Sequence, residues 1–284
     1  MLYLSTSQSN GKISPLICPV CGASLSIVEG KSLYCRGEKR HCFDVSSKGH
    51  VNLAIGHAGG GDPKEAVRAR SEFLRKGYYG RFADGVCDLL SKYVAADAET
   101  VIDAGCGEWY YSERIAESCS VNVVGFDLSK AAIESAAARA KREGREDLMF
   151  AVAGIYSMPI ADGCADGVVN LFAPCAEDEF LRVLKKGGVL LVAGAGEDHL
   201  YGLKERLYET PYKNEKRNDM PQKMKHLEHI TVRFELVLTE ESDKQALFSM
   251  TPYYYRTSKE DASKLFGAPL TTEAEFDIDI YIKE

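Results

Sequence analysis

Short apolar runs alternate with helix-like stretches from residue 99 onward. Helical periodicity lies between the runs, in the alanine-rich stretch 129–141 and in residues 177–184. Strand-sized apolar runs separated by helices predict parallel strands that are buried on both faces. Residues 230–238 and 275–282 instead alternate with period two, which predicts two final antiparallel strands. The five apolar runs are 100–104, 121–127, 149–153, 166–172 and 187–193.

Two amphipathic helices are expected ahead of this series. After the flexible break 59–61, Asp62 as N-cap, Pro63 at the first position and Glu65 at the third predict a helix start with a capping box. A second helix is expected at 82–93. The basic residues of the first helix lie off its apolar stripe (Ala66, Ala69, Phe73 and Leu74), and they either contact phosphates or form a solvated face: Arg68, Arg70, Arg75 and Lys76.

The first sixty residues carry a cysteine cluster. Cys18 and Cys21 form a Cys-x-x-Cys pair, and Cys35, His41 and Cys42 follow. Two short strand-like runs, 23–28 and 31–34, flank a turn at 29–30 and predict a hairpin. Such a small module buries little apolar surface, so bound metal would supply its folding energy.

A zinc site is the favoured interpretation of these ligands. Zinc prefers four thiolate or imidazole ligands in a tetrahedron, and a Cys-x-x-Cys turn supplies two of them. Spacing alone leaves the fourth ligand open between the adjacent His41 and Cys42. A structural zinc is favoured over a redox pair or a catalytic zinc, because no open coordination position is implied. The other five cysteines are scattered and are expected to be buried fillers.

Charge is unevenly distributed along the chain. The net charge is −7, yet residues 31–81 carry eleven Lys or Arg against five Asp or Glu. A basic N-terminal part on an acidic body suggests local contact with a polyanion, with a solvated helix face as the alternative. No run approaches eighteen apolar residues, and no targeting segment is recognised at the start. A soluble, cytoplasmic protein with no membrane contact is therefore expected.

Two acids mark the ends of the first two strands of the α/β series. Asp103 precedes Gly105 and Gly107, and Asp127 ends the next strand. Glycines let a ligand approach the strand-to-helix turn closely, and a carboxylate at the second strand end can accept both ribose hydroxyls of an adenosine. Tyr110 stands where a dinucleotide fingerprint would have its third glycine, so a pyrophosphate is disfavoured.

The fourth strand of the series ends in Asn170-Leu-Phe-Ala-Pro-Cys175. The Asn-Pro-Pro-aromatic pattern that grips an exocyclic amine is absent, so transfer to such an amine is disfavoured. Cys175 invites comparison with thiolate addition to a pyrimidine ring. It has no basic partner nearby in the sequence, and a nucleophilic role is therefore disfavoured.

The Asp103 and Asp127 pattern resembles the class I S-adenosylmethionine-dependent methyltransferases. The resemblance implies an α/β, Rossmann-like fold with a seven-stranded, mostly parallel sheet, behind a small N-terminal zinc-ribbon-like module. It also implies that Asp127 holds the ribose and Asp103 the methionine ammonium. The predicted division is a zinc-binding RNA-recognition module at 1–58, a helical connector at 59–98 and a methyltransferase domain at 99–284, with an insertion or lid at 195–229.

The whole chain is similar to the 23S rRNA guanine-N1 methyltransferases, including the tylosin-resistance type. The motifs are Cys-x-x-Cys…Cys…His41-x-Phe-Asp, Gly77-Tyr-Tyr, Asp103-x-Gly-Cys-Gly-Glu and Met250-Thr-Pro. The resemblance implies a homodimer acting on one guanine of a 23S rRNA hairpin near the peptide exit tunnel, with His41 as fourth ligand. An effect on macrolide binding is left open. The expected cofactor contacts are Tyr79, Asp103, Gly105, Gly107, Glu108, Trp109, Asp127, Leu128, Ile155, Phe172, Ala173 and His199.

Guanine N1 carries a proton at neutral pH, so a general base would assist the transfer. Glu108, Glu177 and His199 are candidates, and Trp109, Tyr110 or Tyr111 are candidates for stacking on an unstacked guanine. Two other functions compete with this hypothesis: a methyltransferase acting on a small molecule, and a zinc-dependent RNA-binding protein without activity. The first leaves the zinc module unexplained, and the intact glycines and acids argue against the second.

Overall fold

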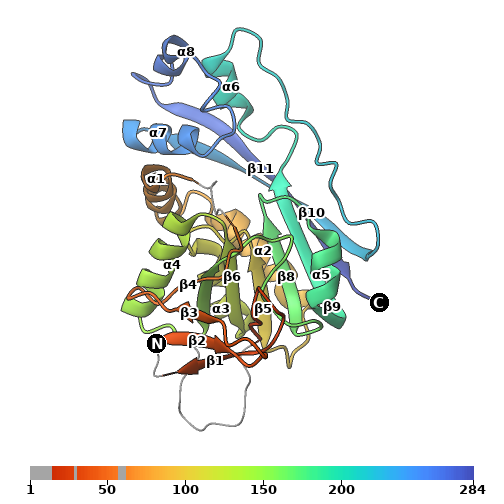
Figure 1. The fold of residues 1–284 in the computed structure, drawn as a ribbon. Helices are drawn as coiled ribbons and strands as arrows, with labels where there is room; N and C mark the ends of the chain where they lie inside the picture. Colours follow the sequence, from red (N-terminus) through yellow and green to blue (C-terminus); the bar gives the residue numbers. More distant parts are fainter. Residues whose placement is uncertain (1–14, 29–30, 57–61) are drawn as a thin grey trace.

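A central eight-stranded sheet organises the molecule (Figure 1). The computed structural model describes residues 15–28, 31–56 and 62–284. The order across the sheet is β10-β11-β9-β8-β5-β6-β7-β4. The strands are β4 (Val51–Asn52), β5 (Thr100–Ala104), β6 (Asn122–Asp127), β7 (Leu148–Val152), β8 (Ala165–Leu171), β9 (Leu184–Ala195), β10 (Lys225–Leu238) and β11 (Leu270–Ile282).

The sheet confirms the predicted mixture of parallel and antiparallel pairs. Strands β4 to β9 pair in parallel, and β10 and β11 join antiparallel at one edge. The eighth strand was not expected. It arises because the N-terminal module contributes β4, which pairs with β7 through Val51 and Ala151.

Helices cover the two faces of the sheet unequally. One face packs against α2 (Gly80–Tyr93), α3 (Tyr110–Cys119) and α4 (Lys130–Arg142), and α1 (Lys64–Arg75) packs on α3, α4 and α7. The hydroxyl of Ser129 accepts the N–H of Ala132 and starts α4 where the sequence predicts it. The other face carries α5 (Glu177–Val183) and the N-terminal module. Beyond the sheet's edge, α6 (Tyr201–Leu207), α7 (Glu241–Ser249) and α8 (Lys259–Ser263) form an upper lobe (Figure 1).

The N-terminal module is part of the main core rather than a free appendage. Its own sheet consists of β1 (Leu25–Val28), β2 (Ser32–Cys35) and β3 (Cys42–Asp44). Leu16, Leu25 and Leu33 are buried in the same cluster as the sheet residues Ile102 and Val124. The module therefore fills much of the face that α5 leaves open. The turn predicted at 29–30 lies outside the described residues.

The predicted capping box of the first helix is wrong. Helix α1 begins at Lys64 with Pro63 as its N-cap, and no side chain caps it. The carboxylate of Asp62 is bound by Arg70 instead, and its backbone oxygen accepts a hydrogen bond from Ser129. The glycine break at 59–61, and with it the predicted domain boundary at 58/59, lies outside the described residues.

The predicted insertion 195–229 contains α6 and the first residues of β10. Between them, residues 208–224 form neither helix nor strand, and we refer to them as the strap. A lid function for the strap and the predicted division at 98/99 stay predictions. Within the described ranges, no helix combines the length and apolar character needed to cross a lipid bilayer.

Candidate functional site

The loop after β5 lies at the carboxyl edge of the parallel strands. Asp103 is buried at its start, and its Oδ2 accepts a hydrogen bond from Ser112 Oγ at 2.6 Å. Burial raises the pKa of Asp103 to about 7, and the hydrogen bond from Ser112 opposes this only in part. The backbone N–H groups of Gly105 and Cys106 both donate to Phe126 O, which ties the loop to β6.

Asp127 is held in a fixed orientation at the end of β6. Its Oδ2 accepts the N–H of Gly107 at 2.9 Å, and its Oδ1 accepts the N–H of Ser129 at 2.7 Å. Burial raises its pKa, while these two N–H donors oppose the shift. The structure therefore brings together the two acids and the glycine loop, as the sequence predicts.

The two glycines of this loop differ in the space around them. Gly105 has φ +89°, and a Cβ on it would lie 2.8 Å from the Cβ of Ala173. Gly107 has φ +57°, and among the described residues nothing lies within 4 Å of the equivalent position. Near the adjoining end of β7, only Leu128 approaches Gly154. Leu128 is half exposed and Ile155 is half-buried, so both are available beside this open space.

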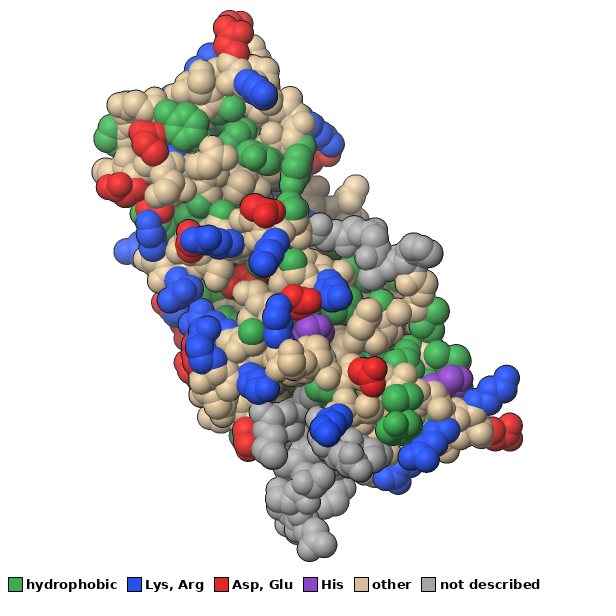
Figure 2. All heavy atoms as spheres, turned by 60° about the vertical axis from the view of Figure 1, so that its left-hand side comes forward, with side chains coloured by type: hydrophobic (Ala, Val, Ile, Leu, Met, Phe, Trp, Pro, Cys, Tyr) green, Lys and Arg blue, Asp and Glu red, His purple; other side chains and the backbone are tan. Residues whose placement is uncertain are grey.

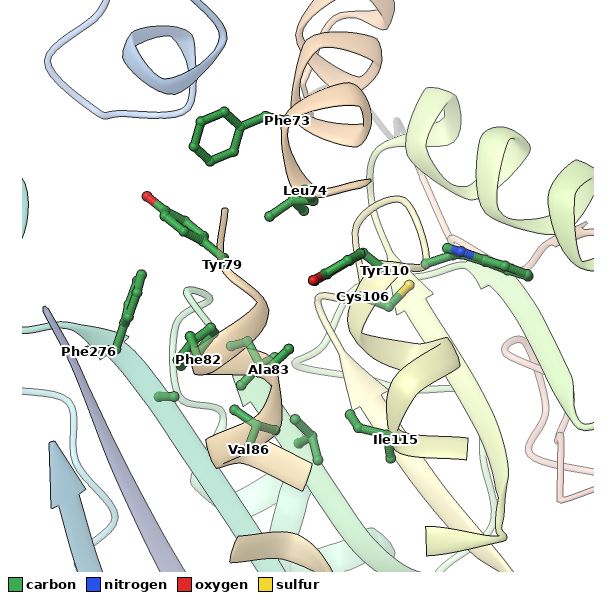
Figure 3. Packing of buried hydrophobic residues seen from close by; sticks show 14 of the residues in the cluster. Phe73, Leu74, Tyr79, Phe82, Ala83, Val86, Cys106, Tyr110, Ile115 and Phe276 are labelled. Atoms are coloured by element: carbon green, nitrogen blue, oxygen red, sulfur yellow. The ribbon is translucent and has the colours of Figure 1, made fainter. Parts of the chain in front are cut away.

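Trp109 is buried in the structure, and its predicted contact with the cofactor or a nucleotide stays a prediction. Its backbone has φ 101°, a conformation that favours glycine, and its ring is fully buried. The guanidinium of Arg139 lies 4.6 Å from the ring centre. Tyr110 is also buried, beside Cys106 and beneath Leu74 (Figure 3). Both rings are buried, so either would have to move before it could stack on a base that arrives from solvent.

The loop after β8 faces the glycine loop. Asn170 Nδ2 donates to Ala104 O and to Pro174 O, both at 3.2 Å, so it links the ends of β5 and β8. Phe172 has φ 56° and is 49% exposed, although its ring also contacts Phe82 and Phe276. It is the exposed aromatic side chain at this point of the site.

Arg217 of the strap holds this loop and was missed in the sequence. Its Nη2 donates to Ala173 O at 2.7 Å and to Asn170 Oδ1 at 3.1 Å. Asp219 pairs with Arg217 and accepts the N–H of Cys175. The strap is polar and lysine-rich, and nothing in its pattern distinguishes this arginine from its neighbours.

Tyr79 and His199, which the resemblance places at the cofactor, lie near each other in the structure. Their ring centres are 6.2 Å apart, and both rings contact Phe276. His199 Nδ1 accepts the backbone N–H of Glu275 at 3.2 Å, so the proton of the neutral ring resides on Nε2. Burial lowers the pKa of His199 to about 4. The ring is therefore neutral at pH 7 and presents a donor.

The other two candidate bases are engaged within the protein. Glu108 is buried, and burial raises its pKa, while the Ser71 hydroxyl and the positive charges of Arg70 and Arg139 oppose the shift. Its Oε1 has no hydrogen-bond partner among the residues that the structure describes. Glu177 Oε1 accepts the backbone N–H groups of Gln222 and Lys223, so Glu177 anchors the end of the strap.

The predicted metal ligands converge. The ligand atoms of Cys18, Cys21, Cys35 and His41 all lie within 4.8 Å of one another. His41 Nδ1 lies 3.4 Å from Cys18 Sγ and 3.3 Å from Cys35 Sγ, near the edge of about 3.7 Å expected for a zinc tetrahedron. Cys42 is exposed and lies outside the cluster. The donor set fits a structural zinc, and it favours His41 as the fourth ligand.

The four basic residues predicted to contact RNA, three on α1 and Lys76 at its C-cap, divide into two groups. Arg68 and Arg75 are exposed, and Arg68 forms an ion pair with Glu72 one turn away. Lys76 pairs with the buried Asp243 of α7. Arg70 turns inward and pairs with Asp62, with its side chain 27% exposed. The first two therefore remain available for a polyanion.

Comparisons with known proteins bear on both parts of the chain. Residues 16–54 match the family model described as "RlmA, N-terminal", a zinc ribbon, and residues 95–257 match the model described as "Methyltransferase domain". The first match covers the four converging ligands. The second begins ahead of β5 and ends beyond α7, so it includes both acids and the glycine loop.

Relatives with curated names extend along most of the chain. YxjB of Bacillus subtilis (strain 168), provisionally named a 23S rRNA (guanine-N(1)-)-methyltransferase, is 30% identical over 93% of this chain and 95% of its own. A 23S rRNA (guanine(748)-N(1))-methyltransferase of Streptomyces fradiae is 32% identical over 68% of this chain and 67% of its own. With its glycine loop, paired acids and Cys3His cluster, the chain belongs to the 23S rRNA (guanine-N1)-methyltransferase family.

Proposed function

We propose that this protein transfers the methyl group of S-adenosylmethionine to N1 of one guanine in a hairpin of 23S rRNA. The observation that carries the proposal is the docking of an RlmA-type zinc ribbon on the same sheet whose strand ends carry Asp103 and Asp127. A methyltransferase for small molecules has no need of such a module. The bound cofactor supplies an electrophilic methyl group on a sulfonium.

The chain's own residues bind and orient the reactants. The Asp127 carboxylate, fixed by two N–H groups, is placed to accept the ribose hydroxyls, and the open space above Gly107 admits the cofactor. Asp103 is placed to interact with the methionine ammonium. Leu128 and Ile155 line the adenine side, and Ala173 closes the site opposite Gly105.

The target guanine has to leave its stack before N1 can meet the methyl group in line. Phe172 offers an exposed ring beside the site on which a purine can stack. His199, neutral and donating through Nε2, suits a hydrogen bond to an acceptor such as a carboxylate or the guanine O6. Its low pKa and its occupied Nδ1 make it a poor base.

A basic surface lies beside the site. Lys and Arg side chains gather across the middle of the face that carries α1 and α4 (Figure 2). Arg68 on α1 and Lys130 and Arg142 on α4 are largely exposed there. Phosphate contacts of this kind position an RNA without reading its sequence, and they weaken as salt rises.

Primer extension tests the proposal. The zinc-loaded protein is incubated with labelled S-adenosylmethionine and 23S rRNA that lacks the modification, with Asp127→Ala as the cofactor-site control. Because methylated N1 cannot form a Watson–Crick pair, we expect a reverse-transcription stop at one guanine, absent with the control. Label that enters small molecules only would instead indicate a small-molecule methyltransferase, and RNA binding without transfer an inactive binding protein.

The proposal extends to a homodimer working in the cytoplasm, where the ribosomal RNA is found. Sedimentation equilibrium of the zinc-loaded chain measures the first point directly. A monomer at micromolar concentration would contradict it.

A further inference from the structure

Arg70 lies on the face of α1 that covers the site. It precedes Phe73 and Leu74 by three and four residues, so the three side chains share one helical face. Phe73 and Leu74 lie above Tyr79, which precedes α2, and above Tyr110, which begins α3 after the glycine loop (Figure 3). The Arg70 side chain is 27% exposed, against 81% for Arg68 two residues away.

Acids surround the Arg70 guanidinium. It pairs with Asp62, whose backbone oxygen accepts a hydrogen bond from Ser129 beside Asp127. Its positive charge lowers the pKa values of Glu108 and Asp127, which burial otherwise raises. The guanidinium therefore lies near the carboxyl ends of both β5 and β6, above the space where the cofactor is expected.

The charges of the cofactor are not all matched by the acids of the site. S-adenosylmethionine carries a sulfonium, an ammonium and a carboxylate. Asp103 suits the ammonium, and Asp127 suits the ribose hydroxyls. Both acids repel the carboxylate, which needs a cationic partner.

Two of the neighbouring guanidiniums are engaged elsewhere, and a third, that of Arg75, lies on the exposed side of α1. Arg139 lies over the Trp109 ring and pairs with Glu143, and Arg217 holds the loop after β8. Asp62 is bound through Nη2 of Arg70, and a guanidinium has five N–H donors in a planar fork that matches a carboxylate.

We propose that Arg70 binds the α-carboxylate of S-adenosylmethionine, and that it thereby selects the intact cofactor over derivatives that lack this group. The proposal rests on the identity of the cofactor and not on which nucleotide is methylated. It also gives Arg70 a role different from the rRNA contact that the sequence suggests.

Calorimetry with two ligands separates the carboxylate from the rest of the cofactor. S-adenosylmethionine and decarboxylated S-adenosylmethionine share the adenosine, the sulfonium and the amine, and they differ in the carboxylate. Each is titrated into the zinc-loaded wild type, Arg70→Ala, Arg70→Lys and the matched control Arg68→Ala. Binding is measured without RNA, so a failure of rRNA methylation does not affect the result.

We expect Arg70→Ala to weaken binding of S-adenosylmethionine roughly 10- to 100-fold, the range for a lost hydrogen bond to a charged group. Its affinity for the decarboxylated ligand should equal that of the wild type. Arg70→Lys should recover part of the loss, and Arg68→Ala should change neither affinity. Equal weakening of both ligands would overturn the proposal, because Arg70 would then only support the loop. Unchanged binding of both would overturn it as well, and a reduced salt dependence of rRNA binding in that variant would return Arg70 to the RNA surface.

Discussion

Replacing Gly105 by alanine tests how closely the loops after β5 and β8 are packed. The added Cβ would lie 2.8 Å from the Cβ of Ala173, whereas ordinary contacts of this kind begin near 3.4 Å. Either loop must move by several tenths of an ångström. Gly107 is the matched control, because it also has a positive φ but has nothing within 4 Å of the new methyl group.

The two substitutions should differ in cost. A non-glycine residue in the left-handed region costs about 1–2 kcal/mol, which is the whole effect expected for Gly107→Ala. Gly105→Ala adds an overpacking cost of about 1–3 kcal/mol to a comparable backbone cost. Because Ala173 belongs to the loop that carries Phe172, the displacement should also reduce turnover, by up to about 100-fold for a misplacement near 1 Å.

Trp109 provides the assay. It is the chain's single tryptophan and is buried in this loop, so its fluorescence during urea unfolding reports on the site itself. The midpoint of the zinc-loaded protein should fall further for Gly105→Ala than for Gly107→Ala. Adding Ala173→Gly removes the opposing methyl group and should recover at least about 0.5 kcal/mol, a coupling typical of residues in contact. Equal costs for the two glycine variants, or no recovery in the double variant, would refute the packing argument.

Three further outcomes are expected. Cys18→Ser should lose bound zinc, measured by plasma mass spectrometry, whereas Cys42→Ser should retain it. Zinc loss from both variants would indicate that Cys42, and not His41, is the fourth ligand. Because the pKa of Asp103 is raised from 3.8 to about 7, its contribution to stability is full below about pH 4 and is lost as pH rises through 7. An ammonium beside it favours the ionised form, so cofactor binding at pH 6 should release a proton in calorimetry across buffers, and Asp103→Asn should abolish that release. Arg217→Gln should lower kcat about 10- to 100-fold with cofactor affinity unchanged, and partial rescue by Arg217→Lys would separate its positioning role from simple unfolding.

Local patterns predict most of the fold and the cofactor edge. The apolar runs at 100–104 and 121–127 overlap β5 and β6, and the acids that end them converge because carboxyl ends of parallel strands share one edge. The metal ligands were identified by type and spacing. The choice between His41 and Cys42 needed the direction of each side chain, which alternates along a strand and depends on where β3 begins.

Features that depend on long-range packing escaped prediction. The inward turn of Arg70, the strap contact of Arg217 and the burial of Trp109 each involve partners from other elements of the fold. The sequence left Trp109 as a candidate for contacting the cofactor or for stacking on a guanine. Its backbone conformation and the Arg139 partner, which place the ring in the core, leave no trace in the local sequence.

The zinc ribbon packs directly on the sheet that carries the cofactor site, so the solubility of the enzyme should depend on bound zinc. Leu16, Leu25 and Leu33 shield Ile102 and Val124 from water, and the ribbon itself depends on its ion for folding. Chelation of the zinc would therefore unfold the ribbon and expose apolar side chains beneath the strands that bind the cofactor. Its effect would go beyond the loss of an RNA-binding module. Protein without zinc should therefore aggregate rather than remain a soluble enzyme with reduced activity.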